Sequence, residues 1–271
     1  MDLLSNIPVL HILAGAVVGF AIGLTGVGGG SLMTPLLLLF GYPAPVAIGT
    51  DLLYAAITKL GGAFSHHRQG NVNWKIVGLL SLGSIPAAIL VHFFVLDTDF
   101  QQSQRFEELL TVSLGIMLIT TSFILFFKDK LRKRATEKPP AVAIALMHRN
   151  RRRMTWIMGL LLGICVTLSS VGAGAFGAAI LLVIYSQTST AKIIGSDIAH
   201  AVPLTFIAGL GYLYAGFVDM VLLLSLLIGS LPAIHLGASL SSRVPEKTLQ
   251  TLLITILFSL GMYYTVFNVL H

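Results

Sequence analysis

The sequence is poor in charged side chains. Only 10% of its 271 residues are Asp, Glu, Lys or Arg, whereas 55% are hydrophobic, and the mean hydropathy is +0.88. Because soluble globular proteins carry about 25% charged residues, this composition excludes that class. Apolar runs of about 20 residues, long enough to span a bilayer, recur along the chain. The sequence therefore predicts an all-α polytopic membrane protein without a separate soluble domain.

Cysteine is almost absent as well. Cys165 is the single cysteine and lies in an apolar segment. The chain alone therefore cannot form a disulfide, a cysteine zinc cluster or an iron–sulfur site, and we expect neither a metal nor a cofactor. Residues 1–7 carry Asp2 but neither Lys nor Arg, so no cleavable signal peptide is expected.

Glycine, in contrast, is concentrated where it would weaken a membrane helix. The uncharged stretch 8–40 contains the motif GLTGVGGGSLMTP at 23–35. Its central glycines are Gly26, Gly28, Gly29 and Gly30, and each costs about 1 kcal/mol relative to alanine in a helix. We expect the helix to break here and to bring backbone N–H groups close to a ligand. The alternative is that these small residues allow close packing of helices.

The chain is an internal duplication. GVGGGS at 26–31 matches SVGAGA at 170–175, IGTD at 48–51 matches IGSD at 194–197, and GSIPA at 83–87 matches GSLPA at 229–233. A repeated order of motifs at a nearly constant spacing indicates duplication and not chance. We divide the chain into a first membrane repeat at 1–127, a basic linker at 128–153 and a second membrane repeat at 154–271.

Each repeat is predicted to contain a glycine-broken segment and three transmembrane helices. The broken segments lie at 8–41 and 154–185. The helices are expected near 44–65, 75–96 and 109–127 in the first repeat, and near 190–213, 219–242 and 248–270 in the second.

The net charge of +6 arises largely in the linker, where it is a signal of membrane topology and not of nucleic-acid binding. The linker is expected to be cytoplasmic. If each broken segment re-enters the membrane, each repeat has three crossings and the second repeat is inverted relative to the first. Arg68, Lys75 and Lys192 then lie on the cytoplasmic side, which favours inverted repeats over parallel ones.

Two carboxylates lie inside apolar helices at matching positions, Asp51 and Asp197. A charged residue at the centre of a membrane helix costs about 3 kcal/mol, so such residues are paired, capping or functional. One interpretation is a cap or first-turn charge at the start of each helix, with Thr50 and Ser196 adding oxygen acceptors. The other is a proton-coupling role.

Lys59 and His200 are the other ionisable candidates within these helices. Lys59 can extend to the cytoplasmic interface or meet an anion inside the membrane. His200 follows Asp197 by three residues on one helix face, a spacing that suits a hydrogen-bonded or proton-relay pair.

The repeated motifs resemble those of the TauE/SafE sulfite exporter family, also called the 4-toluene sulfonate uptake permease family. The resemblance is carried by GLTGVGGGSLMTPLLL, IGTDLLYAAITKLGGAFSHHRQGNVNW and IGSDIAHAVPLTFIAGLGYLYAGFVD, and it covers nearly the whole chain. It implies a secondary transporter, an exporter of sulfite, sulfoacetate or other organosulfonates, coupled to protons, in the inner (plasma) membrane. The second motif departs from the first, since SVGAGA replaces GVGGGS.

The glycine-broken segments would then supply the anion site, because helix N-termini and free N–H groups attract oxyanions. The residues expected to bind the anion are Thr25, Gly28, Gly29, Gly30 and Ser31 in the first break, Ser170, Gly172 and Gly174 in the second, and Lys59. Those expected to couple protons are Asp51, Asp197 and His200. The expected partners are a small anion, protons and the lipid bilayer, and a homodimer is compatible with the sequence.

Two other functions remain open. A cation or metal carrier would use Asp51, Asp197 and His200, although two acids and one histidine are a small ligand set and nearby basic residues oppose cations. An intramembrane enzyme would need a hydroxyl such as Ser169 or Ser170 beside Asp197, but no nucleophile motif is present and duplication is not what a catalytic pair requires. We therefore expect no catalytic residues.

Overall fold

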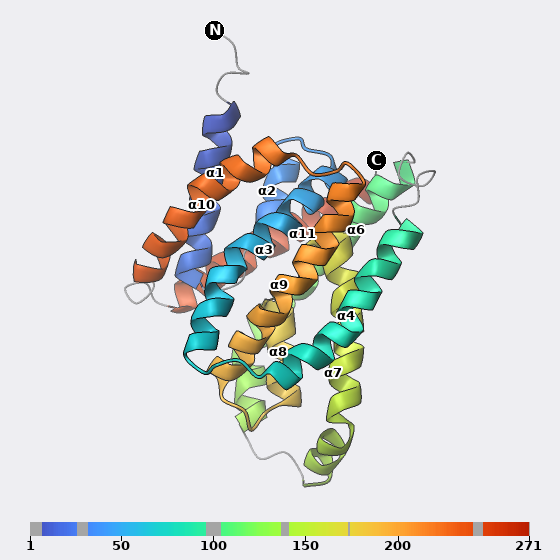
Figure 1. Ribbon diagram of the computed structural model, residues 1–271, viewed down its shortest axis with the longest axis vertical. Coiled ribbons are helices and arrows are strands. Elements are labelled where there is room, and N and C mark those ends of the chain that lie inside the picture. The colour runs from blue at the N-terminus through green and yellow to red at the C-terminus, as the bar shows by residue number, and fades with distance from the viewer. Residues whose placement is uncertain are drawn as a thin grey trace.

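The structure is a computed structural model that describes residues 7–25, 32–95, 104–136, 141–172, 174–240 and 246–270. These residues are organised in helices (Figure 1). The first half contains α1 (Ile7–Thr25), α2 (Met33–Leu39), α3 (Ala44–Arg68), α4 (Trp74–Val95) and α6 (Gln104–Thr136). The second half contains α7 (Ala141–Ser169), α8 (Ala175–Ile184), α9 (Thr190–Tyr214), α10 (Met220–Leu240) and α11 (Glu246–Leu270).

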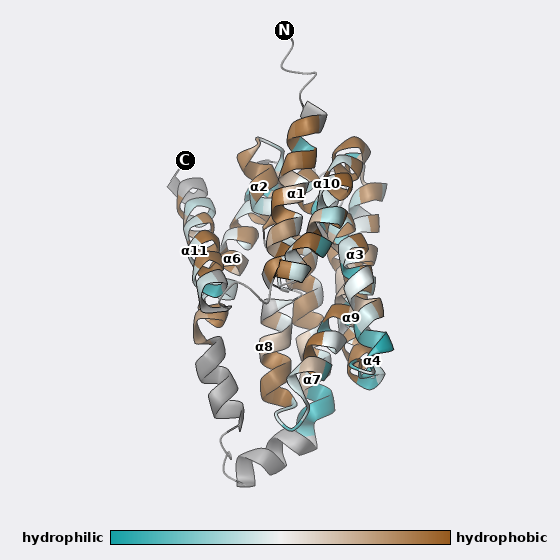
Figure 2. Ribbon diagram, turned by 90° about the vertical axis from the view of Figure 1, so that its left-hand side faces the viewer, coloured by the Kyte–Doolittle hydropathy of each residue, from teal (hydrophilic) through white to brown (hydrophobic). Residues whose placement is uncertain are grey.

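The helices have the length and polarity of membrane spans. Among the described residues, five helical segments are long and apolar enough to cross a bilayer, and two shorter apolar helices accompany them. Figure 2 shows hydrophobic residues along most of the helices and hydrophilic ones at the lower ends of α4 and α7. Large hydrophobic side chains such as Phe93 and Phe94 are about three-quarters exposed. An outer surface of this kind is suited to lipid, which confirms the prediction of a polytopic helical membrane protein.

Helices lie on both sides of each predicted break, and residues 26–31 of the first break lie outside the described residues. The first lies between α1 and α2, and the second lies between α7 and α8. In the second, Ser170, Gly172 and Gly174 have φ angles of 57°, 119° and 136°, so the backbone leaves helical geometry as expected. Such angles cost little at glycine and are uncommon at serine.

The chain reverses direction at each break. The Tyr42 hydroxyl, just after α2, lies 3.0 Å from Nε2 of His11 near the start of α1. In the second half, the Tyr185 hydroxyl, just after α8, lies 2.9 Å from the Thr155 hydroxyl on α7. Each broken segment therefore forms a hairpin whose two ends lie together.

Two helix pairs run in the same direction and join the two halves. A Cβ atom at Gly15, Gly19 or Gly23 of α1 would overlap the backbone of Leu226, Ser230 or Ile234 of α10. The pair α4 and α7 approaches as closely through its own glycines. Small residues allow such backbone contact between membrane helices. Gly23, the first residue of the glycine-rich motif, therefore has the packing role that was the alternative for that motif.

Two further pairs run in opposite directions. Gly49 near the start of α3 lies against Tyr212 near the end of α9, whereas His66 near the end of α3 lies against Gly195 near the start of α9. Helices α6 and α11 pair in the same manner. Figure 1 shows α3 and α9 side by side in the middle of the molecule, with α1 and α10 on one side and α4 and α7 on the other.

The segment predicted as a linker is helical over most of its described part. Helix α6 continues through Thr136, and α7 begins at Ala141. Helices α6 and α7 thus extend beyond the apolar runs from which their ends were predicted.

Candidate functional site

Asp51 is fully buried in α3. Its Oδ2 accepts a hydrogen bond of 3.2 Å from the backbone N–H of Thr34 and a second one from the Thr34 hydroxyl. Thr34 lies in the first turn of α2, so the carboxylate satisfies donors at the start of that helix. The interpretation that Asp51 lies in the first turn of its own helix is wrong, because α3 begins at Ala44 and has no acidic residue there.

Asp197 has the matching place in the second half. It is 1% exposed, and it accepts a hydrogen bond from the backbone N–H of Gly174, immediately before α8. Gly177 packs directly on it, since a Cβ atom at Gly177 would overlap Oδ1 of Asp197. Each carboxylate therefore lies on a central helix and binds the start of the short helix in its own half.

Lys59 lies inside the protein with these two carboxylates. It is 6% exposed, so its ammonium group does not extend to the interface. It interacts electrostatically with Asp197 most strongly and also with Asp51. In the aligned repeats, the position of Lys59 is taken in the second half by Thr205, which is also buried. One buried cation thus serves two buried carboxylates.

His200 is fully buried, but its hydrogen bond does not go to Asp197. Its Nε2 lies 2.8 Å from the Ser84 hydroxyl of α4, and its Nδ1 has no partner among the described residues. The predicted hydrogen-bonded pair of Asp197 and His200 is therefore wrong. His200 interacts electrostatically with Lys59 instead.

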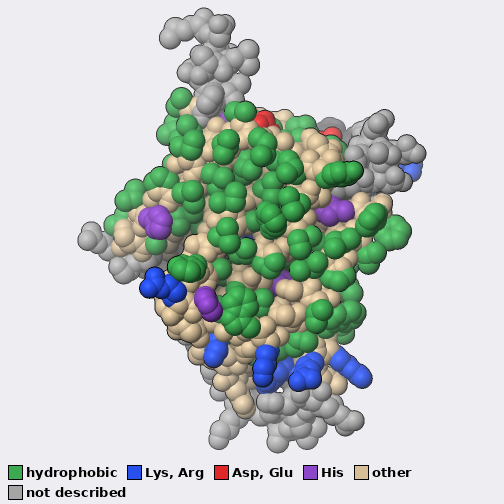
Figure 3. Space-filling view, in the orientation of Figure 1, with side chains coloured by type: hydrophobic (Ala, Val, Ile, Leu, Met, Phe, Trp, Pro, Cys, Tyr) green, Lys and Arg blue, Asp and Glu red, His purple; other side chains and the backbone are tan. Residues whose placement is uncertain are grey.

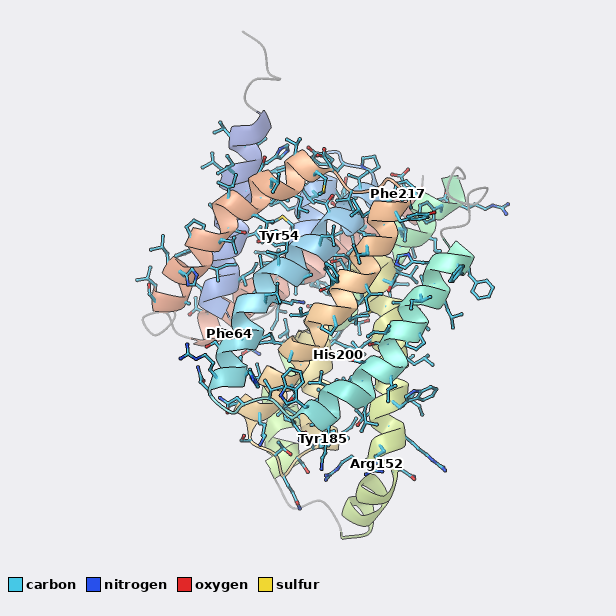
Figure 4. All side chains as sticks on the ribbon, in the orientation of Figure 1. Tyr54, Phe64, Arg152, Tyr185, His200 and Phe217 are labelled. Atoms are coloured by element: carbon cyan, nitrogen blue, oxygen red, sulfur yellow. The ribbon has the colours of Figure 1, made fainter. Side chains whose placement is uncertain are left out.

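The position of His200 corresponds to Tyr54 in the first half, and Ser84 corresponds to Ser230. The Tyr54 hydroxyl lies toward Ser230, yet it has no hydrogen-bond partner among the described residues. Figure 4 shows Tyr54 nearer the end of the molecule that carries Phe217, and His200 nearer the end that carries Tyr185. The two equivalent contacts between the halves thus differ in geometry: Ser84 and His200 form a hydrogen bond of 2.8 Å, whereas the Tyr54 hydroxyl approaches Ser230 without hydrogen-bond geometry.

Thr50 and Ser196 also connect the halves. The Asp219 N–H donates to the Thr50 hydroxyl at 3.3 Å, and the Asn73 N–H donates to the Ser196 hydroxyl at 2.8 Å. The expectation that these hydroxyls cap their own helices is wrong, because each accepts a bond from the residue that precedes a helix of the other half.

Ser170 brings the second break into contact with Asp51 of the first half. It is 2% exposed, and it lies near enough to Asp51 to interact with its carboxylate. Its hydroxyl and Oδ1 of Asp51 are both buried without a hydrogen-bond partner among the described residues. Gly172 lies further from the carboxylates, against the side chain of Met117.

Most of the first break lies outside the described residues. Gly28, Gly29, Gly30 and Ser31 lie outside the described residues, and Thr25 is described only as the last residue of α1. Their assignment to the anion site stays a prediction. The sequence reading missed Thr34, Ser84 and Gly177. Of these, Ser84 belongs to the repeated GSIPA and GSLPA motifs and Thr34 to the glycine-rich motif at 23–35, whereas Gly177 had no visible signal.

The two ends of the bundle differ in charge. Arg68, Lys75, Lys192 and Arg151–Arg153 lie at the end where α3 finishes and α9 begins, and Arg151 stacks on Tyr185 with 4.8 Å between its guanidinium carbon and the ring centre. Glu107 and Asp219 lie at the opposite end, where they accept hydrogen bonds from the N–H groups of Ala44 and Leu222. Figure 3 shows Lys and Arg gathered at the lower end of the visible face.

The site can exchange protons and hold a small charged ligand. Buried carboxylates change protonation more readily than they accept an uncompensated charge, and a buried ammonium group attracts anions. Among the residues that the structure describes, no group of three or more His, Cys, Asp or Glu side chains is placed to hold a metal ion.

Comparison with known proteins gives one consistent result. The family model "Sulfite exporter TauE/SafE" matches residues 11–264. The chain is similar to "Probable membrane transporter protein YjnA" of Bacillus subtilis (strain 168), with 38% identity over 259 residues that cover 93% of this chain and 97% of that protein. It is also similar to "Probable membrane transporter protein YdhB" of the same organism, with 29% identity over 89% of this chain and 94% of that protein. No solved structure matches the chain.

Proposed function

Because the chain belongs to the sulfite exporter TauE/SafE family, we propose that it is a secondary transporter of small sulfur-containing oxyanions. Sulfite, sulfoacetate and other organosulfonates are the proposed substrates, export is the proposed direction, and the plasma membrane is the proposed location. The relatives described above are named as membrane transporters. Transport of this kind needs a site inside the membrane that binds the substrate without chemical change.

The observation that carries this proposal is the buried Lys59. A cation at 6% exposure among apolar helices is costly unless a negative charge accompanies it. Lys59 interacts electrostatically with both carboxylates, and the Ser170 hydroxyl lies beside the Asp51 carboxylate. An oxyanion in this place would find an ammonium group and a hydroxyl donor, which are the groups that bind sulfonate oxygens in water-excluded sites.

We further propose that protons are coupled to the transport through Asp51 and Asp197, with His200 as an additional acceptor. Each carboxylate has an Oδ1 atom without a hydrogen-bond partner among the described residues. A carboxyl group can take up a proton at such an atom without losing the hydrogen bonds at its other oxygen. The charge of the site can therefore follow the charge of its ligand.

The proposed topology is that of inverted repeats with a cytoplasmic linker. A two-fold axis that relates inverted repeats lies in the membrane plane, so a helix and its counterpart run in opposite directions. The antiparallel contact of α3 with α9 and of α6 with α11 supports this arrangement. The basic residues at the linker end and the acidic ones at the opposite end support the orientation.

The unequal contacts between the halves support alternating access. Ser84 and His200 are bonded at 2.8 Å, whereas Ser230 and Tyr54 occupy the equivalent places without such a bond. The two places lie toward opposite ends of the bundle (Figure 4). In a transporter of inverted repeats, the reverse asymmetry would describe the state that opens to the other side.

Proteoliposomes test the proposal directly. With a proton gradient imposed across the membrane, the purified protein should move sulfite or an organosulfonate in the direction of proton flow. Lys59→Met should abolish this flux, while Lys59→Arg should retain part of it. Flux of a divalent cation with none of an oxyanion would favour the cation carrier instead. Chemical conversion of the organosulfonate would favour the enzyme.

A further inference from the structure

We propose that the site selects singly charged oxyanions and takes up one proton with each, because the anion replaces Asp197 as the partner of Lys59. This inference rests on the proposed function and narrows it, since an anion and a proton that bind together cross in the same direction, so that export follows the anion's own outward gradient. Hydrogensulfite and simple sulfonates such as methanesulfonate fit the requirement. Sulfoacetate, which carries a second negative charge, fits it less well.

The first step is a count of buried charge. Among the side chains that the structure describes, the buried acidic and lysine groups are Asp51, Asp197 and Lys59. The second half offers no equivalent of Lys59, since Thr205 takes its position. One positive charge therefore faces two carboxyl groups, and an incoming anion adds a further negative charge to a place where an uncompensated charge is expensive.

The second step identifies the carboxylate that loses its contact with Lys59 when the anion binds. Asp51 is held by the N–H and the hydroxyl of Thr34, and donors of this kind favour a charged carboxylate. Asp197 receives one backbone N–H, from Gly174, and it is the stronger electrostatic partner of Lys59. Its Oδ1 has no hydrogen-bond partner among the described residues. The donors that now hold Asp197 are those that an oxyanion would use.

The third step balances the charges. When a monoanion pairs with Lys59 and Asp197 takes up one proton at a carboxylate oxygen, the total charge of the site is the same before and after binding. A dianion adds one further negative charge to the site unless a second proton is bound. The ionisable groups that face the site from α3 and α9 are Asp51, Lys59, Asp197, His200 and the Tyr54 hydroxyl, so a second proton would have to go to Asp51 or His200.

The test counts protons during binding. Titration calorimetry with methanesulfonate, repeated in buffers of different ionisation enthalpy, should give about one proton taken up per anion bound. Because binding and proton uptake are linked, the affinity should fall about tenfold for each unit of pH increase in the range where the free site is deprotonated. Sulfoacetate should bind at least tenfold more weakly than methanesulfonate.

A variant pair separates the groups. The variant Asp197→Asn should bind methanesulfonate without proton uptake and with little dependence on pH, because the amide cannot take up the proton and Asp51 still accompanies the Lys59 ammonium group. Lys59→Met should lose binding, with Gly78→Ala as a control because a methyl group there meets open space. The proton count on the unaltered protein decides the matter by itself if Asp197→Asn does not fold.

The outcomes are distinct. Binding of methanesulfonate without proton uptake, equal affinity for sulfoacetate, or undiminished proton uptake by Asp197→Asn would each overturn this inference and leave the transporter proposal intact. Failure of sulfite and of every sulfonate to bind would overturn the transporter proposal itself.

Discussion

Substitution of Gly177 by alanine tests whether the position of Asp197 matters for transport. Gly177 lies on α8, and a methyl group there would overlap Oδ1 of Asp197 and lie only 3.1 Å from its Cγ. The carboxylate is buried and cannot move into solvent, so either α8 or the Asp197 side chain must shift. Added atoms in a packed interior cost about 1–3 kcal/mol. A free-energy difference of about 1.4 kcal/mol is a factor of ten in affinity. If the added methyl group destabilises the substrate-bound site by this cost, Gly177→Ala should bind substrate roughly 5- to 100-fold more weakly.

The assay is the initial rate of methanesulfonate uptake into proteoliposomes over a range of concentrations, which separates affinity from turnover. Gly78→Ala on α4 is the matched control, because it adds the same methyl group to a helix where nothing lies within 4 Å. Stability can be followed with a thiol-reactive dye, since the partly buried Cys165 is the single cysteine. Equal transport by the two variants at equal melting temperature would refute the reasoning. A fall in melting temperature with unchanged affinity per folded molecule would assign Gly177 to packing alone.

Three other changes test the remaining features. A C-terminal alkaline phosphatase fusion should be active and a C-terminal fluorescent protein dark, because the inverted topology places that end outside the cytoplasm; bright fluorescence would contradict it. Ser84→Ala should lower transport about fivefold, since the lost hydrogen bond to His200 is worth about 1 kcal/mol. Ser230→Ala should have less effect on substrate binding, and equal effects of the two variants in a binding assay would argue against the difference between the Ser84–His200 and Ser230–Tyr54 contacts. Gly159→Leu should lower the melting temperature sharply because the backbone of α4 leaves no room for a side chain, and Gly78→Leu should be tolerated.

The architecture was largely predictable because it follows from local chemistry. Clustered glycines predict where a membrane helix is interrupted, and the end of an apolar run predicts where it stops. Helix α9 at Thr190–Tyr214 therefore agrees with the expected 190–213. The ends of α6 and α7 were less predictable. A basic segment such as 128–153 can be either a loop or the soluble end of a helix, and composition alone does not distinguish the two.

The site was predictable only in part, because its contacts join segments far apart in the chain. Asp51, Asp197 and Lys59 were visible as charges in apolar helices, and the structure brings them together. The partner of His200 was not visible. The three-residue spacing suggested Asp197, whereas the packing of α4 against α9 offers the Ser84 hydroxyl at 2.8 Å, a contact between residues that are 116 positions apart.

Thr34 is a second contact that the sequence alone did not predict. Thr34 lies within the glycine-rich motif at 23–35, yet nothing in that motif indicates that its N–H and hydroxyl bind a carboxylate. Its role depends on the hairpin returning α2 to α3, where the N–H at the start of a short helix meets Asp51. Sequence patterns identify groups that need a partner more readily than they identify the partner.

The pairing of α1 with α10 and of α4 with α7 has a consequence for the order of synthesis. The ribosome makes α1 first, yet the helix on which α1 packs through Gly15 and Gly19 is made near the end of the chain. Until then, the glycine-lined face of α1 has lipid as its neighbour, and Asp51 has its final hydrogen-bond donor while its half still lacks α10. Neither half of the chain therefore contains all of its packing partners by itself. Two fragments divided at 137–140 should be degraded when made separately and recovered together when made in the same cell.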